Sequence, residues 1–87
     1  MQAVAMWLDH PAVGCGERCF LVAKVGRKWV RLLYPATLAT VALDRTAFER
    51  ARKQAVDAER LLRIARRTRK QYRRLGLRVS AKARAAI

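Results

Sequence analysis

The residue types that carry out catalysis are scarce in this sequence. Its 87 residues include one His, His10, one Ser, Ser80, and six carboxylates, and no two acids are spaced for general acid–base work. A phosphate-binding loop is also missing, because Gly14-Cys15-Gly16 is short and is not followed by the Lys-Ser/Thr that opens a helix in such loops. We therefore expect a protein without enzymatic activity, catalytic residues or a cofactor.

A metal site is the second chemistry that the residue types allow. Asp9, His10, Cys15 and Cys19 could supply four zinc ligands. Structural zinc sites combine one Cys pair with a second pair of ligands at a regular spacing. Here the second pair would be one His and one Asp, whose spacing does not fit such a site. We expect no bound metal and two ordinary thiols, with Cys19 partly buried at a strand start. A Cys15–Cys19 disulfide is disfavoured in a reducing compartment.

Cationic side chains dominate the remaining chemistry. The chain carries 20 Lys and Arg against six Asp and Glu, a formal net charge of +14. So much like charge on a small body repels itself unless a polyanion neutralises it, and nucleic acid is the commonest polyanion, ahead of an anionic membrane. No apolar run is long enough to span a bilayer, and the first ten residues lack the features of a secretory signal. We therefore expect a cytoplasmic protein, free or within a nucleoprotein particle.

The positive charge is concentrated after Glu59, the last acid in the chain. Eleven cations follow it, and like charges at i,i+3 and i,i+4 on a helix repel by about 1–3 kcal/mol in total at low salt. A phosphate backbone would remove this repulsion and release counterions. The alternative is a cationic face that is merely solvated. The predicted nucleic-acid-binding residues in this segment are Arg60, Arg63, Arg66, Arg67, Arg69, Lys70, Arg73, Arg74 and Arg78.

Two aromatic residues stand among cations and could stack on bases. Trp29 is flanked by Lys28 and Arg31, and Tyr72 lies between Lys70 and Arg73. The alternative for both is an aromatic ring that packs against the sheet or the core. The predicted interface is therefore extended by Lys24, Arg27, Lys28, Trp29, Arg31 and Tyr72.

Strand-forming residues must position the cations and Trp29 of the segment from Lys24 to Arg31. Residues 1–18 contain breakers, and residues 19–43 are rich in Val, Leu, Phe, Trp, Tyr and Thr, which favour strands. Gly26-Arg27 suits a two-residue type II′ hairpin turn. That turn pairs Lys24 with Trp29 and gives one core face that comprises Leu21, Ala23, Val30, Leu32 and Tyr34. Leu38–Leu43 predicts a third strand, and Ala3–Leu8 is a candidate fourth.

A long helix is predicted to position the Arg-rich segment. Thr46-Ala-Phe-Glu49 fits a capping box, and Gly76 suits the residue that follows a helix, so we expect one helix over residues 46–75. Its apolar stripe follows a 3-4 spacing, and residues 77–87 form a short second helix or a basic tail. The stripe comprises Phe48, Ala51, Ala55, Ala58, Leu62 and Ala65, which is too rich in Ala to predict a coiled coil, so the oligomeric state stays open.

The elements together predict a single α+β domain over residues 1–87. A three-stranded antiparallel meander, or a four-stranded one, packs on the front half of the long helix, with a basic C-terminal tail. That helix would be about 45 Å long, while a compact chain of this size is about 30 Å across. Its cationic rear half is therefore expected to project from the body, to pair with another copy, or to break.

These features predict a non-enzymatic accessory protein that lays an Arg-rich helix along the phosphates of RNA or DNA. The alternative is a small phage-type regulator or inhibitor, or a ribosome-associated protein, that docks on a larger nucleic-acid machine through its sheet and helix. Binding to a membrane surface is a third interpretation, weakened because the rear half lacks a bulky apolar face.

Overall fold

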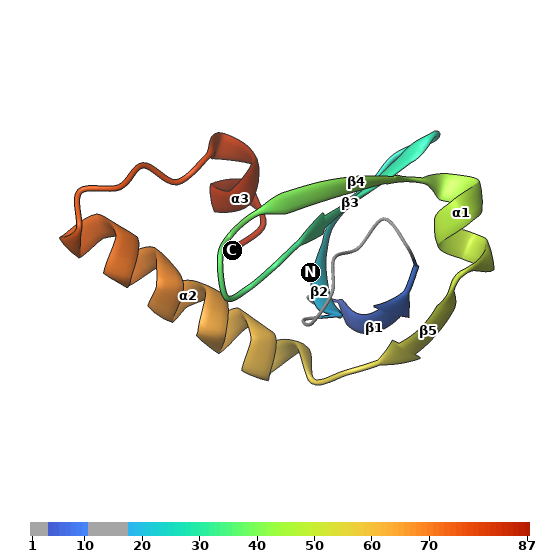
Figure 1. Cartoon of the computed structure of the whole chain (residues 1–87), viewed down its shortest axis with the longest axis horizontal. Coiled ribbons are helices and arrows are strands. Elements are labelled where there is room, and N and C mark those ends of the chain that lie inside the picture. The colour runs from blue at the N-terminus through green and yellow to red at the C-terminus, as the bar shows by residue number, and fades with distance from the viewer. Residues whose placement is uncertain (1–3, 11–17) are drawn as a thin grey trace.

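The α+β class is confirmed. The computed structural model describes residues 4–10 and 18–87. In these residues a five-stranded antiparallel sheet is accompanied by three helices (Figure 1). The elements in chain order are β1 (Ala5–Asp9), β2 (Cys19–Val25), β3 (Trp29–Leu33), β4 (Thr40–Asp44), α1 (Arg45–Arg50), β5 (Arg52–Ala55), α2 (Ala58–Arg74) and α3 (Ala81–Ala85).

The sheet has the strand order β4-β3-β2-β1-β5. The candidate fourth strand is β1, the third predicted strand is β4, and β5 was not predicted. In Figure 1 the chain leaves β4 through α1 and returns as β5 alongside β1, so the sheet is strongly curled. Each of its faces is partly covered by other parts of the chain.

The predicted register of the β2–β3 hairpin is wrong. The Gly26 N–H donates to the Trp29 carbonyl oxygen at 2.8 Å, so Arg27 and Lys28 form the turn. Lys24 lies opposite Arg31, and a bulge between Val22 and Lys24 then shifts the pairing by one residue. Because alternate residues of a strand face opposite sides, this bulge decides which side chains share a face.

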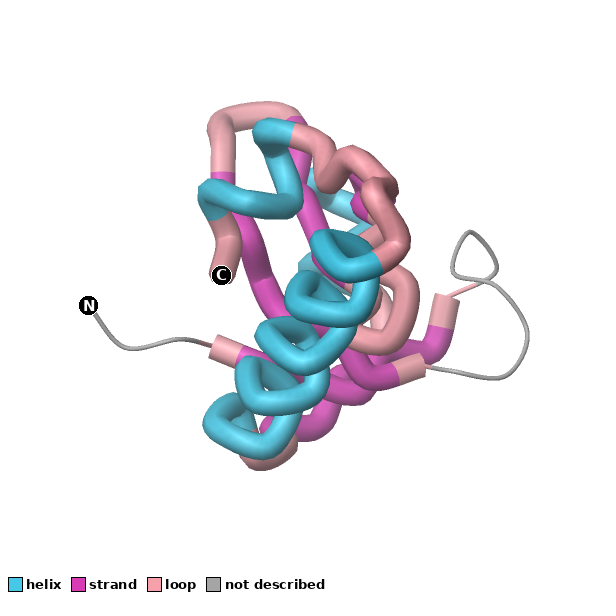
Figure 2. The backbone as a smooth tube through the Cα atoms, turned by 90° about the vertical axis from the view of Figure 1, so that its left-hand side faces the viewer, coloured by secondary structure: helices cyan, strands magenta, loops and turns pink. Residues whose placement is uncertain are grey.

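The single predicted core face is replaced by two cores, one on each side of the sheet. Leu21 lies opposite Leu33, so it does not share a face with Leu32. The first core lies between the sheet and helices α2 and α3, and Figure 2 shows α2 crossing in front of the strands. It comprises Ala5, Leu21, Leu33, Leu38, Leu61, Ala65 and Ala83. The second lies inside the curl, partly covered by Phe48 of α1, and comprises Leu8, Phe20, Val30, Leu32 and Leu43.

The predicted capping box is wrong, because α1 begins one residue earlier. Asp44 is the N-cap, and its Oδ1 accepts from the backbone N–H groups of Thr46 and Ala47 at 2.8 and 3.3 Å. Glu49 does not reach back to the cap but pairs with Arg45, with 3.1 Å between Oε1 and Nε. Asp and Thr are both good N-cap residues, and Asp44 occupies the position at which β4 ends.

The single helix over residues 46–75 is also wrong, since the chain leaves the helical path at Ala51. The Lys53 ammonium group lies against the end of α1 and donates to the carbonyl oxygens of Phe48, Glu49 and Ala51 at 2.5, 3.0 and 3.1 Å. Lys53 also lies 4.9 Å from the centre of the Phe48 ring. These contacts satisfy carbonyl groups that a helix end leaves unpaired, and they direct the chain into β5.

Of the three outcomes expected for the long helix, the break is the one observed, and the projecting cationic rear half is wrong. A new helix, α2, starts after Asp57, whose Oδ1 accepts from the N–H groups of Glu59 and Arg60 at 3.1 and 3.3 Å. Its 17 residues span about 25 Å, within a molecule of 39 × 29 × 23 Å. The cationic segment is therefore docked on the sheet along one side.

Replacement of Lys53 by Ala distinguishes a continuous helix from the observed break after α1, because the two predict different changes in the free energy of unfolding. In a continuous helix Ala is the better helix former, so Lys53→Ala would leave stability unchanged or raise it. In this fold it removes the contacts at the end of α1, and the free energy of unfolding should fall by about 1 kcal/mol. Urea unfolding measures the difference. Arg52→Ala, at the neighbouring exposed position, should change it by less than about 0.5 kcal/mol.

The end of α2 is confirmed at Gly76, which has a φ of 71°. The Leu77 N–H donates to the Tyr72 carbonyl at 2.8 Å and the Gly76 N–H to that of Arg73 at 3.2 Å, which is the Schellman arrangement. Ser80 then caps α3 by accepting from the Ala83 N–H at 3.2 Å. Of the two alternatives for residues 77–87, the short helix is the one observed.

Candidate nucleic-acid interface

One side of α2 anchors the helix to the body of the protein. Leu61, Ala65 and Thr68 are buried at helical spacing, and Tyr72 is half-buried one turn further. The Thr68 hydroxyl lies 3.0 Å from the carbonyl oxygens of both Pro35 and Ile64, and can donate to either. The Tyr72 hydroxyl donates to the Thr37 carbonyl at 2.8 Å. These contacts hold the helix in one rotational setting on the β3–β4 loop.

The opposite side of α2, with the segment that follows it, carries the predicted cations of residues 60–78. All of them are exposed except Arg69, which is half-buried. The two ion pairs of the described residues, Asp9 with Arg18 and Glu49 with Arg45, leave every cation after Glu59 without a carboxylate within 4.0 Å. The exposed members are Arg60, Arg63, Arg66, Arg67, Lys70, Arg73, Arg74 and Arg78. We call Arg60–Arg78, with these side chains, the α2 cationic surface.

The acids of the described residues are mostly committed elsewhere. Asp44 and Asp57 accept backbone N–H groups at helix starts, while Asp9 and Glu49 form ion pairs. Glu59 alone lies beside the cations of α2, at the first turn of the helix. Among the described residues, the α2 cationic surface therefore keeps its positive charge.

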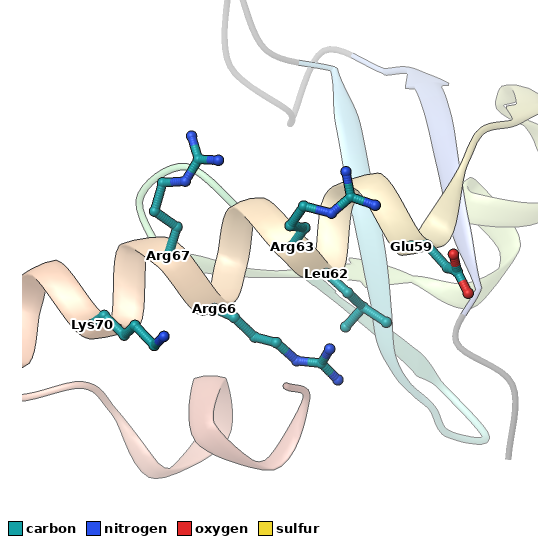
Figure 3. Close-up of a pocket in the computed structure, with 6 residues that line it drawn as sticks. All are labelled: Glu59, Leu62, Arg63, Arg66, Arg67 and Lys70. Atoms are coloured by element: carbon teal, nitrogen blue, oxygen red, sulfur yellow. The ribbon is translucent and has the colours of Figure 1, made fainter.

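A shallow hollow of about 620 Å³ lies along this surface. Figure 3 shows Arg63 and Arg67 extending to one side of the helix, and Arg66 and Lys70 extending to the side on which α3 lies. Glu59 stands apart at the N-terminal end. Four cations on successive turns are arranged to contact a chain of anionic groups rather than a single ion, because each points to a different place along the helix.

The cationic side chains continue around the end of α2 toward α3. A second hollow of about 380 Å³ is lined by Arg69, Arg73, Arg78 and Arg84. Arg84 was not among the predicted site residues, and neither was Lys82, which is exposed on the same short helix. Their charge was visible in the sequence, but only the return of α3 toward α2 brings Arg84 into this group.

The predicted residues of the β2–β3 hairpin form a second group, away from the α2 hollow. Lys24, Arg27, Lys28, Trp29 and Arg31 line a cavity of about 200 Å³ at the hairpin tip. Trp29 keeps 57% of its surface exposed, so it is not a core residue, while the alternative of a ring that packs against the sheet stays open. Tyr72 differs, because it packs against the first core and its hydroxyl is already bonded.

Three of the four candidate zinc ligands, Asp9, His10 and Cys19, lie within the described residues. No group of three or more His, Cys, Asp or Glu side chains is placed to hold a metal ion within residues 4–10 and 18–87. Cys19 is a free, half-buried thiol at the start of β2, as expected. Cys15 and the Gly14–Gly16 segment lie outside the described residues. None of the described helices has the length and apolar character needed to cross a membrane.

Comparisons with protein families, with curated proteins and with solved structures find no match to this chain.

Proposed function

We propose that this protein is a non-enzymatic nucleic-acid-binding protein that contacts the phosphate backbone through the α2 cationic surface. One observation carries the proposal: the cations of α2 lie on the side of the helix that faces away from the core, most of them exposed, and without carboxylate partners among the described residues. Such a surface is stable in a cell when a polyanion neutralises it. A cytoplasmic location accords with this ligand.

The composition of the surface supports a phosphate ligand. Arg supplies most of the cations, and its planar guanidinium group forms paired hydrogen bonds with phosphate oxygens. The contacts are with the backbone and carry no direct sequence information. We therefore expect binding of both RNA and DNA with weak sequence preference, and parallel titrations with RNA and DNA of one sequence would rank the two.

The salt dependence of binding tests the proposal. Each neutralised phosphate lowers the slope of log K against log salt by about 0.7–0.9, so about six contacts should give a slope near −5. Fluorescence anisotropy with a labelled oligonucleotide, measured between about 50 and 200 mM salt, gives this slope. A slope shallower than about −2 would rule out a ligand held mainly through its phosphates.

A second candidate function is docking on a larger protein of a nucleic-acid machine. It is favoured by an apolar cleft of about 610 Å³ beside α2, lined by Leu21, Leu62 and Ile87, with Val4 and Val25 at 52% and 58% exposure. Such a partner should remain bound after nuclease treatment and at high salt, whereas nucleic acid should be lost. Purification with and without nuclease, followed by absorbance and mass measurements, separates the two candidates.

A further inference from the structure

We propose that one ligand contacts both the α2 cationic surface and the cations around Trp29, passing over the outer face of the sheet, and that Trp29 stacks on an unpaired base. The ligand is then a single strand rather than a duplex. This inference rests on the proposed function and deepens it by naming the class of nucleic acid. Its basis is the position of Trp29 relative to α2 and the construction of the hairpin tip.

Strand pairing places Trp29 on the helix side of the sheet. Residues 29, 31 and 33 of β3 share a face by alternation, and Leu33 of this face packs against α2 in the first core. Arg31 lies opposite Lys24 and Trp29 opposite Asp44. The face that α2 covers at Leu33 is therefore uncovered nearer the tip, where Trp29 is exposed.

The tip is held in place by contacts with the start of α1. The Arg45 N–H donates to the Lys28 carbonyl at 2.8 Å, and the Arg45 guanidinium donates to the Gly26 carbonyl at 3.3 Å. A Cβ atom at Gly26 would lie only 3.1 Å from the Trp29 carbonyl oxygen, so glycine allows the tip to close tightly. A fixed backbone at the tip reduces the conformational freedom that is lost there when a base binds.

The surroundings of Trp29 suit a nucleotide. Its cavity is lined by Lys24, Arg27, Lys28 and Arg31, which could hold the phosphates on either side of a stacked base. Asp44 is the acid paired across from Trp29, and its carboxylate is bonded to the first N–H groups of α1. The charge at the tip is therefore positive around an exposed aromatic face.

The apolar cleft over β2 lies between the two cationic groups, and one cation of each group lines it. Arg66 lines the α2 hollow and also the cleft over β2, and Lys24 lines that cleft and also the Trp29 cavity. The molecule is 39 Å long, so a strand that follows this path would span several nucleotides, within the ~4–16 that small single-strand-binding folds cover. A duplex could reach the α2 cationic surface, but its bases are stacked and paired, and Trp29 could not stack on them.

Replacement of Trp29 in the full chain tests the inference. For a single-stranded DNA of about 12 nucleotides, Trp29→Ala should weaken binding by about 5- to 150-fold. Binding of the duplex of that sequence should change by less than about twofold, because its contacts are with phosphates only. Trp29→Phe keeps a stacking ring and should recover most of the lost affinity. Urea unfolding of each variant reports whether the fold is retained.

An abasic strand of equal length provides the decisive control, because it keeps the phosphates and lacks the bases. The affinity of the wild-type protein for it should match that of Trp29→Ala for the normal strand. If Trp29→Ala lost the same affinity for the single strand, the duplex and the abasic strand, the stacking role of Trp29 would be overturned. It would also be overturned if Trp29→Ala lost no affinity for the single strand. Both results would leave the proposed function in place, whereas failure of all three ligands to bind would overturn the two proposals together.

Discussion

A variant with Arg63, Arg66, Arg67 and Lys70 replaced by Gln should bind nucleic acid about a thousandfold more weakly at ~0.1 M salt. These four residues line the α2 hollow, and each is exposed without a carboxylate partner. Loss of about four phosphate contacts should also reduce the salt slope from about −5 to about −2. Anisotropy titrations at several salt concentrations measure both quantities.

The stability of this variant should not fall with its affinity. Pairs such as Arg63/Arg67 and Arg66/Lys70 repel each other at i,i+4, by a few tenths of a kcal/mol per pair. Gln is a good helix former, so the free energy of unfolding should stay constant or rise by up to about 1 kcal/mol at low salt. A surface that lowers the stability of the folded protein but supports binding is typical of a functional site.

Charge-matched double variants separate a local effect from one of net charge. Arg66→Gln with Lys70→Gln should weaken binding about 30-fold. Arg50→Gln with Arg52→Gln removes the same charge from exposed positions of α1 and β5, and should weaken it by less than about threefold. Equal losses in the two double variants would show that only the overall charge matters, and would contradict a defined interface on α2.

Leu61→Ala should lower the free energy of unfolding by about 3 kcal/mol. Leu61 is 3% exposed and joins α2 to the first core, where truncation leaves a cavity. A chain of this size has a total stability of about 4–13 kcal/mol, so the change removes a large part of it. Thermal and urea unfolding, followed by circular dichroism, measure the loss.

Leu75→Ala is the matched control for this prediction. Leu75 is the residue that ends α2, and 71% of it is exposed, so its truncation should cost less than about 0.5 kcal/mol. Similar losses for the two variants would contradict the packing of α2 on the sheet. They would instead support a helix that stands away from the body.

The strands could be predicted from composition, but their register could not. Val, Leu, Phe and Trp in residues 19–43 indicate β structure, and β2, β3 and all of β4 but its last residue lie there. The bulge after Val22 adds one residue to β2 and moves Leu21 to the face of Leu33. A bulge of this kind depends on how the sheet curls around its cores, which no local pattern reveals.

The position of the break between α1 and α2 could not be predicted from the sequence, for a related reason. Residues Arg52–Ala55 read Arg-Lys-Gln-Ala, a sequence that favours helix, and all four are exposed, so no apolar alternation marks a strand. Pairing with β1, more than forty positions away, decides their conformation. A long-range contact of this kind overrides local propensity. The end of α2 was predictable, because Gly76 acts through its own backbone.

The charge of the candidate site could be predicted, but its shape could not. The lack of acids after Glu59 indicates that the cations remain unpaired, and this holds whether they lie on one long helix or on a shorter docked one. The position of Arg84 near Arg73 depends on α3, and the exposure of Trp29 depends on which part of the sheet α2 covers. Both are consequences of tertiary packing.

The most direct test is a map of backbone amide chemical shifts during titration of the ¹⁵N-labelled protein with a single strand of about 12 nucleotides. We expect saturable shifts concentrated in Arg60–Arg74 of α2 and in the tip residues Gly26–Trp29. Shifts confined to α1 and β5, or no shifts at nucleic-acid concentrations that saturate binding in anisotropy, would contradict it.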